Sequence, residues 1–180
     1  MAQSFDEKGS EAGGYVLDFD GTGDYVDIGD VHEDIQTISF WIQANAVGGT
    51  RNVIDLNSTA YISIVAGEVT AVGIASPTYY LNAIAGEQTI KIGIWYHVAV
   101  TTATPVDAGD VDIGRVVTAA GSDVDYFNGK INEVRLWDDE RDSTQIRAYY
   151  NRNLPNPYNN AHLKLYLRMN NGEGIIAFDH

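Results

Sequence analysis

The stretch Tyr126–Leu154 reads YFNGKINEVRLWDDERDSTQIRAYYNRNL, and its pattern changes half-way. Its first half alternates apolar and polar residues, as a strand does when it buries one face. Its second half offers Asp142 or Ser143 as a helix cap, and apolar residues then recur at helical spacing. These are Ile146, Tyr149 and Tyr150. The prolines and asparagines that follow favour turns, so the stretch predicts a strand, a polar turn and one short helix.

Most of the chain consists of short alternating segments rich in valine, isoleucine, tyrosine and threonine, with turn residues between them. Many short strands at regular spacing predict an antiparallel sandwich or jelly roll rather than βαβ units. The expected strands span residues 15–19, 24–28, 37–44, 51–56, 60–66, 68–75, 78–84, 88–94, 96–103, 110–115, 130–137 and 163–169.

The chain has 180 residues, no cysteine and a formal net charge of −14. A single domain of this size can bury enough apolar surface without disulfides, and cysteine chemistry is excluded. Residues 1–14 are polar and glycine-rich and are expected to be a flexible leader without the apolar core of a signal peptide, followed by one domain over 15–180. The acidity disfavours nucleic acid and anionic membranes as partners, and no apolar run approaches the ~20 residues that span a bilayer.

Four segments, in this order, resemble laminin-G-like, concanavalin A-like jelly-roll domains of the lectin and glucanase (pentraxin-like) superfamily. They are LDFDGTGDYVDIGD (17–30), TISFWIQA (37–44), WYHVAVT (95–101), and DIGR (112–115) followed by the stretch 126–154. AHLKLYLRMNNGEGIIAFDH (161–180) also resembles the family's closing strand. The resemblance covers roughly residues 15–180 and implies an all-β antiparallel sandwich with one short helix near the C-terminal part and one concave sheet.

In such a sandwich the alternation directs ten apolar side chains inward, because a one-residue slip would bury the aspartates. These are Leu17, Phe19, Val26, Ile28, Ile38, Phe40, Val98, Val100, Val134 and Leu136. The chain departs from the family pattern between VAVT and DIGR, where relatives carry a longer hairpin. That trimming is expected to expose a sheet edge or a surface for homo-oligomerisation.

Catalysis is disfavoured by the arrangement of acidic residues. Retaining glucanases of the superfamily need two carboxylates about 5 Å apart, supplied by a Glu-x-Asp-x-x-Glu strand. The nearest match starts at Glu133, but Arg135 stands two residues later and favours the ionised form of Glu133. The four histidines lack zinc-ligand spacing, and His97 is interpreted as a satisfied structural histidine. We expect a protein that binds rather than an enzyme.

Calcium is the one cofactor that the sequence suggests, and calcium takes six to eight oxygen ligands. An EF-hand is rejected because Gly29 stands where the bidentate glutamate belongs and the flanks are strands. In several relatives an ion near the sandwich edge is held by backbone carbonyls and an acidic side chain close to the end of the domain. By that resemblance the ligands here would be Asp20, Gly21, Asp24 and Asp179. The alternative is that the two turn aspartates only hydrogen-bond local amides.

Aromatic residues near strand ends and in loops are predicted to stack on sugar rings. These are Tyr79, Tyr80, Tyr126, Phe127 and Tyr158. The three tryptophans, Trp41, Trp95 and Trp137, lie within or beside expected strands and are predicted to be core residues.

The function expected from these features is a non-catalytic, lectin-like module that binds glycans or another extracellular surface, with calcium stiffening the binding loops. The alternative is a structural, adhesion or virion-surface decoration domain that acts through protein contacts and oligomerisation. Glycoside hydrolysis is a weaker alternative. The expected location is extracellular or on a virion surface.

Overall fold

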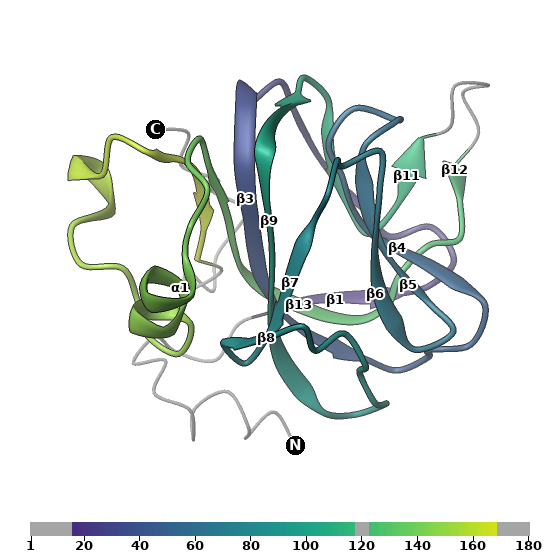
Figure 1. The fold of residues 1–180 in the computed structure, drawn as a ribbon. Coiled ribbons are helices and arrows are strands. Elements are labelled where there is room, and N and C mark those ends of the chain that lie inside the picture. Colours follow the sequence, from purple (N-terminus) through teal and green to yellow (C-terminus); the bar gives the residue numbers. More distant parts are fainter. Residues whose placement is uncertain (1–15, 118–122, 169–180) are drawn as a thin grey trace.

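The computed structural model describes residues 16–117 and 123–168, which form two packed antiparallel sheets and a cover of one helix and loops (Figure 1). Every ladder between named strands is antiparallel. The predicted all-β antiparallel sandwich with one short helix near the C-terminal part is therefore confirmed. Residues 1–14 lie outside the described residues, so the predicted leader boundary stays a prediction.

The strands divide between two main sheets. The first sheet contains β1 (Leu17–Asp20), β3 (His32–Ala44), β7 (Thr78–Leu81), β8 (Ile84–Ala85), β9 (Trp95–Ala108), β13 (Asn128–Trp137) and β14 (Leu163–Leu167). Its order is β1-β13-β3-β9-β7-β8, and β14 also pairs with β13. The second sheet contains β2 (Val26–Gly29), β4 (Thr50–Asp55), β5 (Tyr61–Val65), β6 (Glu68–Val72) and β10 (Val111–Ile113), in the order β2-β10-β4-β5-β6. The remaining elements are β11 (Val116–Val117), which pairs with β12 (Asp123–Val124), the helix α1 (Ser143–Tyr149) and the 3-10 helix η2 (Pro157–Asn159).

The main core fills the space between the two sheets. Of the ten side chains predicted to point inward, seven are buried in this core, and Leu17, Val26 and Ile28 pack against it half-buried. The three tryptophans are also buried, as predicted, at 3 to 5% exposure. Their rings lie in separate clusters outside the main core.

Strand β13 keeps its apolar side chains inward by means of a bulge. Its register with β3 shifts between Asn132 and Arg135, and Glu133 takes a left-handed φ of 53°. The extra residue lets Ile131 and Val134, three positions apart, both reach the main core. A bulge of this kind re-aims the side chains beside it. Here it leaves Glu133 and Arg135 buried together as an ion pair.

The predicted helix is confirmed, and its cap is the first of the two residues predicted. Asp142 accepts a hydrogen bond from Gln145 N (2.8 Å), and Gln145 Oε1 accepts one from Asp142 N (2.9 Å). This capping box satisfies two of the backbone N–H groups that a helix start leaves free. On its buried side Ile146 packs on Tyr80 and Ala99, and such burial contributes about 1.5–3 kcal/mol.

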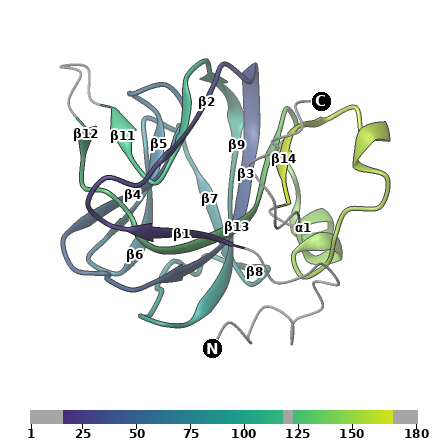
Figure 2. The ribbon, with the colours of Figure 1, turned by 180° about the vertical axis from the view of Figure 1, so that it is seen from behind.

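The helix and the loops around it cover one side of the first sheet. Figure 1 and Figure 2 place α1 and the yellow-green segment before β14 on the side that faces away from the second sheet. The indole of Trp41 on β3 donates to the backbone oxygen of Tyr150 at 2.9 Å, which ties the end of α1 to this outer face. The sandwich thus has a third, partial layer over β3, β9 and β13.

Strand β9 and the segment before it differ from the sequence predictions. The strand predicted over 88–94 is wrong: the segment has a single bridge at Thr89 and a turn at Ile92 and Gly93 but is otherwise irregular, and Ile92 and Ile94 are half exposed or more. Gly93 has a φ of 74°, which breaks the alternation that the sequence suggested. The segment between VAVT and DIGR continues β9 to Ala108, and only two residues separate it from β10.

Candidate functional site

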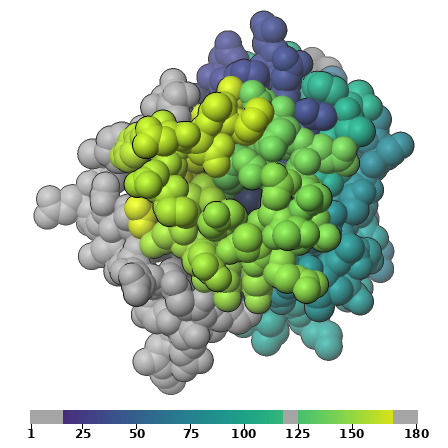
Figure 3. All heavy atoms as spheres, turned by 60° about the vertical axis from the view of Figure 1, so that its left-hand side comes forward, coloured from purple at the N-terminus to yellow at the C-terminus, as the bar shows by residue number. Residues whose placement is uncertain are grey.

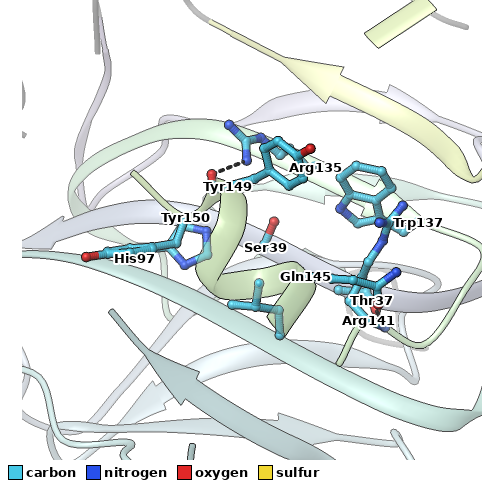
Figure 4. Close-up of a pocket in the computed structure, with 10 residues that line it drawn as sticks. Thr37, Ser39, His97, Arg135, Trp137, Arg141, Gln145, Tyr149 and Tyr150 are labelled. Carbon is cyan, nitrogen blue, oxygen red and sulfur yellow. Dashed lines mark hydrogen bonds between the residues drawn. The ribbon is translucent and has the colours of Figure 1, made fainter. Parts of the chain in front are cut away.

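A hollow lies between the outer face of the first sheet and α1 (Figure 4). Strand β3 contributes Thr37 and Ser39 to its lining, β9 contributes His97, and β13 contributes Arg135 and Trp137. Its cavity volume is about 20 Å³, and about 10–15 Å³ suffices for one water molecule. Figure 3 shows a narrow opening among the green atoms of the cover, with dark blue atoms of β3 at its bottom.

The strand pleat explains why polar side chains line this hollow. Successive side chains of a strand point to opposite faces. On β3, Ile38 and Phe40 enter the main core, and Ser39 between them therefore faces outward. On β9, Val98 enters the core and His97 faces outward. The roof comes from the turn and helix after β13, which contribute Arg141, Gln145, Ile146, Tyr149 and Tyr150.

His97 is the most unusual of these side chains. It is 3% exposed, and its Nδ1 has no hydrogen-bond partner among the described residues. Its ring lies edge-on to Trp41 (centroids 5.6 Å apart) and to Tyr150 (5.9 Å). Burial, with a contribution from the positive charge of Arg135, lowers the pKa of His97 to about 3, so the ring is neutral at pH 7.

A neutral imidazole carries one hydrogen-bond donor and one acceptor. A buried polar atom without a partner is costly, and in native proteins it is rare enough to require an explanation. The interpretation of His97 as a satisfied structural histidine is therefore wrong in one respect, since its buried Nδ1 has no hydrogen-bond partner among the described residues.

Arg141 is held in a fixed orientation at the other side of the hollow. Its guanidinium carbon lies 3.8 Å from the centre of the Trp137 ring. Its backbone N–H donates to Thr37 Oγ1 (2.9 Å), which in turn donates to the Asp139 carbonyl (2.7 Å). Asp139 Oδ1 lies 3.1 Å from Arg141 Nε, and within the described residues the two terminal guanidinium nitrogens make no hydrogen bond. In Figure 4, Ser39 lies between His97 on one side and Trp137 on the other.

Beneath the hollow, the buried charges of β13 neutralise one another. Arg135 Nη2 lies 2.7 Å from Glu133 Oε2, and Tyr166 donates to the same oxygen at 2.5 Å. Arg135 also donates to the carbonyls of Tyr149 (3.0 Å) and Arg152 (2.9 Å), which pins the end of α1. Burial raises the pKa of Tyr166 to about 12. Glu133 is therefore engaged in structure and does not line the hollow.

The aromatic residues predicted to stack on sugars differ in their exposure, and none of them lines the hollow. Phe127 is fully buried against Phe19 (centroids 6.0 Å apart), so the prediction of an exposed stacking ring is wrong for it. It is wrong for Tyr80 as well, which is buried under Ile146. The other three remain at least partly accessible. Tyr158 is 71% exposed, and Tyr79 and Tyr126 are half-buried. The hydroxyl of Tyr79 accepts a hydrogen bond from Ala71 N.

In the predicted calcium turn, the two aspartates accept hydrogen bonds from groups of the turn itself. Thr22 donates two hydrogen bonds to Asp20. Its backbone N–H donates to Oδ1 (2.7 Å), and its hydroxyl donates to Oδ2 (2.8 Å). Asp24 Oδ2 accepts from Asp20 N at 3.0 Å, and the bond from the Thr22 backbone lowers the pKa of Asp20. Gly21 has a φ of 83°, and Asp179 lies outside the described residues. In the described part of the turn, the two carboxylates are thus engaged in local hydrogen bonds, as the alternative interpretation of these aspartates expects.

One cluster of metal-ligating groups occurs in the described part of the chain. It consists of Asp138, Asp139 and His162, whose ligand atoms lie within 4.8 Å of one another. Lys164 Nζ lies 2.8 Å from Asp138 Oδ2, and His162 Nδ1 lies 2.8 Å from Asp138 Oδ1. Arg141 lies beside Asp139. Side chains of the protein therefore already neutralise these carboxylates.

Comparison with known proteins identifies the group of proteins to which this fold belongs. A family model described as the concanavalin A-like lectin/glucanases superfamily matches residues 20–113. The chain belongs to this superfamily. The resemblance found in the sequence is thereby confirmed. The matched region supplies β3 and β9 to the hollow, whereas β13 and α1 lie beyond it.

One similar solved structure, at 1.50 Å resolution, is that of a candidate carbohydrate-binding protein from Bacteroides ovatus ATCC 8483. It covers 92% of this superfamily member and 56% of its own chain, with a TM-score of 0.58 and 16% identity. The present chain thus spans little more than half of that protein, and the likeness concerns the fold. No curated protein sequence matches. Among the described residues, no helix is long and apolar enough to cross a membrane.

Sequence reasoning missed the hollow, although one signal was available. Residues 130–168 carry seven of the eleven lysines and arginines but only five of the twenty-five aspartates and glutamates. This segment therefore has a net charge of +2 in a chain of −14. Such asymmetry marks a region with its own electrostatic role.

Proposed function

We propose that this chain is a non-catalytic glycan-binding module, and that the hollow beneath α1 is its binding site. One observation carries the proposal: the hollow joins a buried imidazole with an unpaired Nδ1, the Ser39 hydroxyl and an arginine oriented by Trp137. Sugar hydroxyls both donate and accept hydrogen bonds, so they match a neutral imidazole and a serine. Sites of this kind combine apolar walls with a few converging polar groups.

The size of the hollow determines how a glycan would bind. A cavity of about 20 Å³ admits one oxygen-sized substituent and not a sugar ring. The ring would stay at the opening, beside the half-buried Tyr149, while one substituent enters the hollow.

Membership of a superfamily that includes lectins and a structural likeness to a candidate carbohydrate-binding protein support this proposal. The composition of the lining favours binding over hydrolysis. Glycoside hydrolysis requires a pair of carboxylates, and the described residues that line the hollow include no aspartate or glutamate. We propose extracellular glycans as the ligands.

An array of purified glycans, probed with the full chain, tests the proposal. The variant Ser39→Val fills the hollow with two methyl groups and should abolish binding, because the pleat points this side chain into the cavity. Tyr158→Ala serves as the matched variant, since Tyr158 is exposed on the same cover but lies outside the hollow. Loss of binding in Tyr158→Ala with retention in Ser39→Val would move the site away from the hollow. Absence of binding to every glycan would refute the function.

Calcium remains a separate proposal for the Asp20–Asp24 turn, supported by its two exposed carboxylates and by the family resemblance. If the turn and Asp179 bind calcium, the midpoint of thermal denaturation should rise from excess chelator to millimolar calcium, because a ligand of the folded state stabilises it. Asp24→Asn should reduce that rise. An identical midpoint in both conditions would eliminate the site.

A second candidate function, self-association, is favoured by three exposed isoleucines. Ile84 lies on β8, the last strand of the first sheet, while Ile92 and Ile94 lie in the segment before β9. They are 59%, 59% and 50% exposed, and exposed apolar side chains at a sheet edge favour association. Light scattering at several concentrations should then show a dimer or larger species, and Ile92→Lys should return it to monomer. A strictly monomeric chain would exclude this function.

A further inference from the structure

We propose that the hollow is selective for a carboxylate-bearing sugar, a uronic acid unit, whose carboxylate is bound by Arg141. This inference rests on the glycan-binding function proposed above and adds the class of glycan. It is carried by the distribution of charge, by the free terminal nitrogens of Arg141 and by the size of the hollow.

The charge around the hollow differs in sign from that of the protein as a whole. The cover and the strand beside it, residues 130–168, carry +2, whereas the rest of the chain carries −16. Screening limits the reach of distant charges to about 8 Å at physiological ionic strength, so nearby charges dominate inside a site. No acidic side chain is among the described residues that line the hollow, and of its two arginines Arg135 is neutralised by Glu133, whereas Arg141 has Asp139 on its Nε side only.

Arg141 has the geometry that carboxylate recognition requires. Stacking on Trp137, with the guanidinium carbon 3.8 Å from the ring centre, holds the guanidinium plane in place. Asp139 lies on the Nε side at 3.1 Å and leaves the two terminal nitrogens for a ligand. A guanidinium binds a carboxylate through two parallel N–H bonds, which a neutral sugar hydroxyl cannot reproduce.

The interior of the hollow complements one carboxylate oxygen. Ser39 offers a hydroxyl, and the imidazole of His97 lines the hollow beside it. The volume of about 20 Å³ accepts one oxygen-sized group, so one carboxylate oxygen would enter the hollow while both oxygens face the two terminal nitrogens of Arg141, which lines the same hollow.

Calorimetric titration with uronic acid oligosaccharides tests the inference. The probes are oligogalacturonate, oligoglucuronate, oligomannuronate and oligoguluronate, each paired with its carboxyl-reduced counterpart of the same linkage. At least one acidic probe should bind about tenfold more tightly than its reduced partner, because a charge-assisted bond is lost on reduction. Arg141→Gln should remove this preference.

The matched control is Arg147→Gln, which removes the same charge from an exposed position of α1 outside the hollow. It should leave the preference unchanged. Because Arg141 also packs on Trp137, Arg141→Lys provides a second variant that keeps the charge and loses the two-pronged geometry. We expect it to weaken binding of the acidic probe several-fold, with thermal denaturation confirming that the variant is folded.

Three outcomes would overturn the inference in distinguishable ways. Equal affinity for acidic and reduced probes refutes the acidic class but leaves the glycan-binding function intact. If the preference for the acidic probe over its reduced partner survives in Arg141→Gln, or disappears equally in Arg147→Gln, then Arg141 does not bind the carboxylate. A failure to bind both these probes and every glycan on the array refutes the function together with the inference.

Discussion

Acidification should destabilise this protein through His97, and the size of the effect follows from its burial. The folded ring has a pKa of about 3, lowered mainly by burial, whereas an unfolded histidine titrates near 6.5. Below pH 6.5 the unfolded chain therefore takes up a proton that the folded chain does not. Stability is fully present above pH 6.5 and falls by about 1.4 kcal/mol per pH unit until pH 3.

Between pH 7 and pH 4.5 the loss attributable to His97 is about 2.5 kcal/mol. That is a large part of the ~5–15 kcal/mol by which domains are stable, so urea unfolding followed by tryptophan fluorescence can measure it. The variant His97→Phe keeps an aromatic ring beside Trp41 and Tyr150 but cannot titrate. Carboxylates that titrate in this range affect both proteins alike and cancel in the comparison.

The wild type should thus lose about 2.5 kcal/mol more than His97→Phe between pH 7 and pH 4.5. Equal losses in the two proteins would refute the argument that the imidazole is neutral and shielded in the folded state.

Three further predictions concern stability, each measured by urea unfolding. Asp142→Ala removes the helix cap and should cost about 1 kcal/mol, more than the same change at the neighbouring Ser143. Glu133→Gln leaves the buried Arg135 without its ion partner and should cost about 3–5 kcal/mol; a loss below 1 kcal/mol would contradict the buried pair. Gly21→Ala should destabilise by about 1 kcal/mol or more, because φ is 83° and a Cβ there would lie 2.9 Å from the Cβ of Asn128.

Much of the fold could be predicted from the sequence because each local preference agreed with the tertiary contacts. The period-two alternation of Ile38 and Phe40 is enough to assign a buried face, whatever the partner strands are. The helix was equally local, since Asp142 and Gln145 form its cap within four residues. Residues 88–94 show the limit: they alternate like a strand but have only an isolated bridge to a neighbouring strand.

The candidate site was hidden from the sequence because its parts are far apart along the chain. Ser39, His97 and Arg141 come from β3, β9 and the turn before α1, and only strand pairing and docking of the helix bring them together. Exposure was equally hard to predict, because a loop aromatic such as Phe127 is buried by strands distant in sequence.

The sequence alone determined what depends on neighbouring residues: the strands, the capped helix, the absence of cysteine chemistry and the superfamily resemblance. Tertiary structure decided which polar side chains of the outer face would be covered. Closure of α1 over the first sheet removes water from His97 and leaves its Nδ1 unpaired, and this follows from long-range packing that no local pattern encodes. The same closure brings Arg141 onto Trp137, with the guanidinium carbon 3.8 Å from the ring centre.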